Sequence, residues 1–114
     1  YITGMGTDPN GSQQWARDKG RAELEIAELA AATYMRSFGY RSAMVRRTSE
    51  RATAAEHMME SLLKPGLLVI TAKDLGGAML EIAARTDELP NGTIIDNADS
   101  IVYADAYKAH AAQR

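Results

Sequence analysis

The sequence predicts an α+β fold, in which a long N-terminal helix and a second helix pack on a small sheet. Apolar residues at helical spacing fill the first half of the chain, and short β-branched runs between glycine- and proline-rich breaks fill the second half. The chain has 114 residues, of which 46% are hydrophobic and 25% charged, as in one globular domain. We therefore expect a flexible N-terminal arm over residues 1–11 and a single globular domain over residues 12–114.

The arm is predicted from its turn chemistry. The run Thr7-Asp8-Pro9-Asn10-Gly11 combines side chains that bond their own backbone with a fixed φ and a glycine. Two more glycines precede this run, at positions 4 and 6. Such a segment is expected to become ordered only against a partner.

The first helix is predicted between Trp15 and Phe38 from residues that recur at three- and four-residue steps: Ala22, Ile26, Leu29, Thr33, Tyr34 and Phe38. Ser12 is placed to cap its start. Gly20 is expected to weaken its first half by about 1 kcal/mol relative to alanine. Gly39 has the residue type that commonly occupies the left-handed position at a helix end.

A second helix is expected from Thr53 onward. The sequence Thr53-Ala-Ala-Glu56 has the form of a capping box, in which the two polar side chains satisfy each other's backbone amides. Apolar residues continue to Leu63, and Lys64-Pro65-Gly66 ends the run. Between the two helices, residues 40–47 alternate weakly between apolar and polar, which leaves a strand open there.

The C-terminal half contains the sheet, and two topologies remain open for it. Leu67–Ile70 is a short apolar run that predicts a buried strand. The pair Gly76-Gly77 favours a hairpin turn and an antiparallel meander, which is the arrangement we favour. Alanine and glutamate after this pair favour a helix instead. In that alternative, a small α/β unit, helices over Ala78–Arg85 and Ala98–Ala112 alternate with strands Leu67–Thr71 and Thr93–Ile95.

Several classes of chemistry find no support in the sequence. Cysteine is absent, so thiolate catalysis and zinc–sulfur sites are excluded. His57 and His110 lack metal-ligand spacing, and neither lies in a nucleophile–base motif. The net charge of −2 argues against broad nucleic-acid binding, and no apolar run reaches membrane-spanning length. We expect no catalytic residue, metal or cofactor, and the sequence favours a non-enzymatic protein.

One ligand site is considered as an alternative. If a helix begins directly after the strand Leu67–Thr71, an anion could bind at its positive end. The residues involved would be Thr71, Lys73, Gly76 and Gly77. This alternative describes the chain as a small α/β phosphate- or nucleotide-binding domain or enzyme, although the segment matches no established phosphate-binding motif.

The separation of basic and acidic residues along the chain is the strongest indication of function in the sequence. Arginines are concentrated in one stretch, and acidic residues in another that lacks basic residues between Arg85 and Lys108. We expect these clusters to form an interface with protein partners, in a homo-oligomer or a hetero-assembly, by meeting head to tail. The sequence thus predicts a non-enzymatic assembly or interaction subunit of a ring, shell, virion or secretion-type machine. The interface residues are Arg36, Arg41, Arg46, Arg47, Arg51, Asp87, Glu88, Asp96, Asp99 and Asp105.

Overall fold

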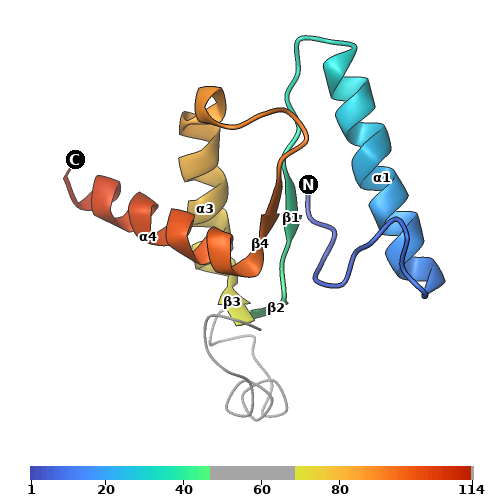
Figure 1. Ribbon diagram of the computed structural model, residues 1–114. Helices are drawn as coiled ribbons and strands as arrows, with labels where there is room; N and C mark the ends of the chain where they lie inside the picture. The colour runs from blue at the N-terminus through green and yellow to red at the C-terminus, as the bar shows by residue number, and fades with distance from the viewer. Residues whose placement is uncertain (47–68, 114) are drawn as a thin grey trace.

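The computed structural model describes residues 1–46 and 69–113, and these residues have an α+β fold, as predicted. The predicted second helix, which starts at Thr53, lies outside them. Figure 1 shows the elements in the order α1 (Gln14–Ala31), β1 (Gly39–Arg41), β2 (Met44–Arg46), β3 (Val69–Thr71), α3 (Ala72–Ala84), the 3-10 turn η1 (Thr86–Glu88), β4 (Ile94–Asp96) and α4 (Asn97–Ala112).

The strands pair in parallel, so the antiparallel arrangement that we favoured is wrong. β1 pairs with β4, with Tyr40 opposite Ile95, and β2 pairs with β3, with Val45 opposite Ile70. β3 leads directly into α3 and not into a hairpin, so the tight turn that an antiparallel meander needs does not form at Gly76-Gly77. The alternative of helices alternating with strands therefore fits the described C-terminal half.

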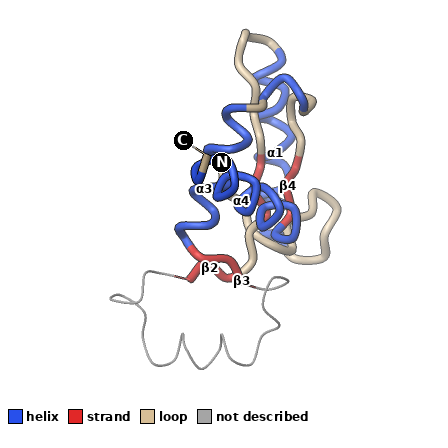
Figure 2. Tube along the Cα trace, turned by 90° about the vertical axis from the view of Figure 1, so that its left-hand side faces the viewer, coloured by secondary structure: helices blue, strands red, loops and turns tan. Residues whose placement is uncertain are grey.

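Gly77 explains why the glycine pair does not make a turn. A Cβ atom at Gly77 would lie 3.0 Å from the Tyr107 ring, so the glycine lets α4 approach α3 closely. The two helices lie side by side in Figure 1 and Figure 2. The start of α3 is fixed by Thr71, whose side-chain oxygen accepts a hydrogen bond from the Asp74 amide at 3.0 Å. Close helix packing outweighed the turn propensity of two adjacent glycines.

The apolar core lies between the strands, α3 and α4. Its buried members are contributed by β1, β3, α3 and β4: Tyr40, Ile70, Leu75, Ile82 and Ile95. Partly buried side chains surround them, and these include Ile101 and Tyr103 of α4. The core is thus built almost entirely without α1, which Figure 1 shows on the far side of β1.

The N-terminal segment runs alongside β1. The Thr3 amide donates to the Tyr40 carbonyl at 3.0 Å, and the Tyr40 amide donates to the Tyr1 carbonyl at 2.8 Å. Ile2 and Tyr40 form a parallel bridge. The flexibility expected of residues 1–11 stays a prediction, but residues 1–3 have the hydrogen bonding of an added edge strand.

Helix α1 ends earlier than predicted, at Ala31 and not at Phe38. The Thr33 hydroxyl donates to the Ala30 carbonyl and accepts from the Met35 amide, which diverts the backbone from the helical ladder. Gly39 begins β1 and does not cap the helix; a Cβ atom there would lie 2.8 Å from the Tyr1 hydroxyl. The helix begins after Gln13, so Ser12 is not its cap.

Candidate functional site

Helix α1 packs on the rest of the domain through small and polar residues. The residues that it buries are Ala16, Gly20, Glu23 and Ala30, none of which has a large apolar side chain. Leu29, which the sequence pattern assigned to the buried face, is 68% exposed. Leu29 therefore does not pack into the core that the structure describes.

A buried ion pair joins α1 to β1. Arg41 holds the Glu23 carboxylate through two hydrogen bonds, Nε to Oε1 at 3.1 Å and Nη2 to Oε2 at 2.7 Å. The Thr3 hydroxyl donates to Oε1 at 2.6 Å. The Glu23 side chain is only 4% exposed. Burial alone would raise the pKa of Glu23, but the hydrogen bonds from Arg41 and Thr3 outweigh it and lower that pKa below its ordinary value.

Other members of the two predicted charge clusters also pair within the chain. Arg36 Nη1 lies 3.8 Å from the Asp87 carboxylate and donates to the Thr86 carbonyl. Glu88 pairs with Arg85 at 2.8 Å. Asp87 is 99% exposed, so its pair with Arg36 is loose and open to water. The structure therefore brings one basic and one acidic cluster member together on a single face.

The remaining interface candidates are spread more widely. Asp96 caps α4 by accepting from the Asp99 amide at 2.8 Å, and Asp105 pairs with Lys108 at 3.4 Å. Arg46 belongs to β2, whereas Arg47 and Arg51 lie outside the described residues. Their predicted role at an interface stays a prediction.

The predicted anion site lies at the start of α3. Thr71 and Lys73 stand at the helix N-terminus, but Gly76 and Gly77 lie within the helix. Their amides therefore donate to carbonyls four residues earlier and not to a ligand. The first turn also carries the Asp74 carboxylate, which pairs with Lys108 at 3.0 Å. An anion at this site would meet a negative side chain and no glycine cradle.

Sequence patterns did not reveal the buried carboxylate on α3. The Glu81 side chain is 4% exposed, and its Oε1 accepts a hydrogen bond from Arg85 Nη1 at 3.3 Å. The His110 Nδ1 atom lies 2.8 Å from the same oxygen and 3.1 Å from Oε2. The hydrogen bond with His110 is the main cause that lowers the pKa of Glu81. This cluster ties the end of α4 to α3. Within residues 1–46 and 69–113, no three metal-ligating side chains gather in a group.

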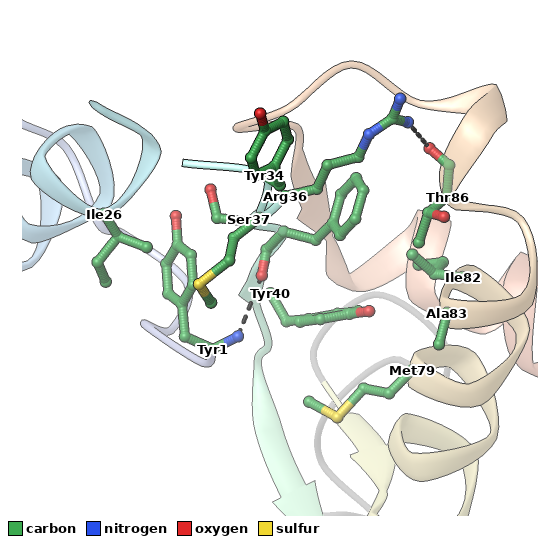
Figure 3. A pocket seen from close by; sticks show the side chains of 12 residues that line it. Tyr1, Ile26, Tyr34, Arg36, Ser37, Tyr40, Met79, Ile82, Ala83 and Thr86 are labelled. Atoms are coloured by element: carbon green, nitrogen blue, oxygen red, sulfur yellow. Dashed lines mark hydrogen bonds between the residues drawn. The ribbon is translucent and has the colours of Figure 1, made fainter. Parts of the chain in front are cut away.

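An open apolar groove of about 730 Å³ lies between α1 and α3 (Figure 3). Figure 3 shows Ile26 of α1 on one side, Met79 and Ile82 of α3 on the other, and the Tyr40 ring between them. Burial and the neighbouring Tyr103 raise the pKa of Tyr40 to about 12, so its hydroxyl stays neutral. Tyr1, Phe38 and Thr86 also line the groove.

Two exposed side chains stand at the edge of this groove. Tyr34 is fully exposed and Met35 is 70% exposed, although both belong to the lining. The sequence signal was present, because Tyr34 and Phe38 were part of the helical apolar pattern and methionine suits adaptable contacts. The pattern predicts a helix as far as Phe38, but α1 ends at Ala31, so these side chains belong to the segment that follows the helix.

No helix in the described ranges has both the length and the apolar character to cross a membrane. No protein-family model matches the chain, and no curated protein matches it either. The candidate function therefore rests on the groove and its surroundings.

Proposed function

We propose that this chain is a non-enzymatic interaction subunit that assembles into a larger complex through the groove between α1 and α3. The main observation that supports this proposal is that the aromatic-lined groove lies next to Tyr34 and Met35, whose side chains are exposed to water. Contiguous apolar surface on a small domain commonly marks a protein-contact site, because its exposure to water is unfavourable. Met79 and Met35 suit such a surface, since the thioether side chain adapts its shape to a partner.

A ligand-binding α/β domain is the second candidate. It is favoured by one observation, namely that α3 begins directly after β3 at Ala72, as that hypothesis requires. The internal position of the two glycines and the Asp74 carboxylate weigh against it. A thermal-shift screen with phosphates and nucleotides tests it: a rise of several degrees in melting temperature would support the ligand-binding candidate over the interaction subunit.

Assembly is tested by measuring the mass of the protein in solution. Light scattering at low and high salt, over a wide range of protein concentration, is expected to show species heavier than the 12.4 kDa chain. Because the contact surface is mainly apolar, association should persist at high salt, where exposed ion pairs are screened. A monomer at every concentration and salt would contradict the proposal.

The predicted head-to-tail contribution of the charge clusters is tested separately. Replacing Arg46 and Arg47 together by glutamate should abolish assembly if these arginines meet an acidic surface. The melting temperature should change little, because exposed ion pairs contribute about 0–1 kcal/mol to folding. Asp99→Lys is the matched reversal, since Asp99 is exposed, whereas Asp96 also caps α4. Normal assembly of the double variant would remove the arginines from the interface.

A further inference from the structure

We infer that the groove receives a second copy of this chain, in a two-fold symmetric pair in which Tyr34 of each copy enters the groove of the other. This inference rests on the proposed function and names the partner. A two-fold contact uses the same patch on both copies, so the patch must complement itself. The groove face has the two elements that this requires, a projecting group and a hollow.

The projecting group is Tyr34. Its side chain is fully exposed and stands at the edge of a hollow of about 730 Å³ that is lined by Tyr40, Phe38 and Met79. In Figure 3 the Tyr34 ring lies above the groove and Tyr40 lies within it. Aromatic rings that meet edge to face or offset gain about 0.5–1.5 kcal/mol beyond the burial of their area.

The charges beside the groove favour a second copy of the chain over a partner whose charges are all of one sign. Arg36 and Thr86 line the groove, and the Arg36 guanidinium donates to the Thr86 carbonyl. Asp87 follows Thr86 in sequence, and its carboxylate lies 3.8 Å from Arg36 Nη1. A strongly acidic or strongly basic peptide would place a like charge against one of the two. A second copy turned by 180° instead places its Asp87 opposite Arg36 and its Arg36 opposite Asp87. Complementary charges of this kind fix the register of an interface.

This arrangement differs from the head-to-tail contact expected from sequence. Head-to-tail contacts use two different patches and generate rings or filaments, whereas a shared patch closes on itself as a dimer. Because Arg36 and Asp87 lie on one face and not on opposite faces, this pair fits a closed dimer.

The first experiment is sedimentation equilibrium of the wild-type chain and of Tyr34→Ser. The variant should weaken the dimer by about tenfold or more, as expected for an aromatic residue at the centre of an interface. Its melting temperature should stay close to that of the wild type at a concentration where both are monomers, because Tyr34 is already exposed. Val102→Ser is the matched control: Val102 is also an exposed apolar residue, but it belongs to α4 and does not line the groove.

The second experiment mixes two charge variants. In Arg36→Asp alone, both copies carry only acidic groups at the contact, and in Asp87→Arg alone both carry only basic groups. Each variant should therefore be weakened as a dimer, and an equimolar mixture should regain association as a mixed pair. Weakening of each single variant together with recovery in the mixture requires that residues 36 and 87 of different copies face each other, because like charges would otherwise already meet in the wild type.

The outcomes separate the inference from the proposed function. If the wild type associates but neither Tyr34→Ser nor the charge variants alter it, the groove dimer is wrong; the chain then still assembles as a subunit, but through a surface other than the groove. If the wild type stays monomeric at all concentrations, both are wrong. Weakening by Tyr34→Ser together with recovery in the mixture supports the inference.

Discussion

Replacing Glu23 by glutamine is expected to lower the free energy of unfolding by about 3 kcal/mol, because it leaves the Arg41 guanidinium without its carboxylate. Breaking a buried ion pair costs roughly 3–5 kcal/mol, and the lower end applies here because Arg41 is 31% exposed and keeps some contact with water. The amide oxygen of glutamine still accepts from Thr3, so the loss comes mainly from the charge. Urea denaturation followed by circular dichroism measures it.

Glu25→Gln is the matched control, since Glu25 is exposed on the same helix. That variant should change the free energy of unfolding by less than about 0.5 kcal/mol. Equal losses in the two variants would mean that the ion pair with Arg41 does not fasten α1.

The same ion pair has a pH signature. The pKa of Glu23 is lowered in the folded protein, so its contribution to stability is fully present above the ordinary glutamate value of 4.5. That contribution should disappear as the pH falls from this value through the lowered pKa. Wild type and Glu23→Gln should therefore differ in stability at neutral pH and converge in acid, because the carboxyl group is then neutral in both states of the wild type.

Replacing Gly20 by alanine is expected to destabilise the protein by about 3 kcal/mol, although helix propensity favours alanine by about 1 kcal/mol. A Cβ atom at this position would lie 2.3 Å from the backbone nitrogen of Pro9 and 2.7 Å from the Asp8 carbonyl carbon. Both neighbours are backbone atoms, so relief requires that the loop before α1 move away from the helix.

Gly76 offers a matched control in α3. A Cβ atom there meets nothing within 4 Å, so Gly76→Ala should stabilise the protein by about 0.5–1 kcal/mol through helix propensity alone. The two substitutions thus have opposite expected signs in the same denaturation experiment. Stabilisation by Gly20→Ala would show that the loop at Pro9 does not press on the helix.

Gly20 also illustrates how far the sequence could predict the fold. Periodicity placed a helix near the N-terminal end and a strand over Leu67–Ile70, which overlaps β3, because both signals are local. The cost of alanine at Gly20, the close approach of Tyr107 to Gly77 and the parallel pairing of β1 with β4 all depend on segments distant in sequence. No local propensity contains that information.

The groove could not be predicted from the sequence for a related reason. The pattern that included Tyr34 and Phe38 is helical in sequence, but α1 ends at Ala31 and the following residues extend toward β1. Side chains expected on the last turns of a helix therefore line an open groove. The charge clusters were visible in the sequence, but it could not show that Arg41 turns inward to Glu23 while Arg36 meets Asp87 at the surface.

The distance between spin labels on two copies tests the self-association most directly. Because the chain has no cysteine, single labels can be attached at Ala84→Cys or Ala72→Cys, two exposed positions at opposite ends of α3, about 18 Å apart along the helix. Ala84 follows Ala83, which lines the groove. We expect dipolar coupling between copies, with a shorter distance for the label at position 84 than for the label at position 72. An absence of coupling, or a shorter distance at position 72, would contradict pairing through the groove.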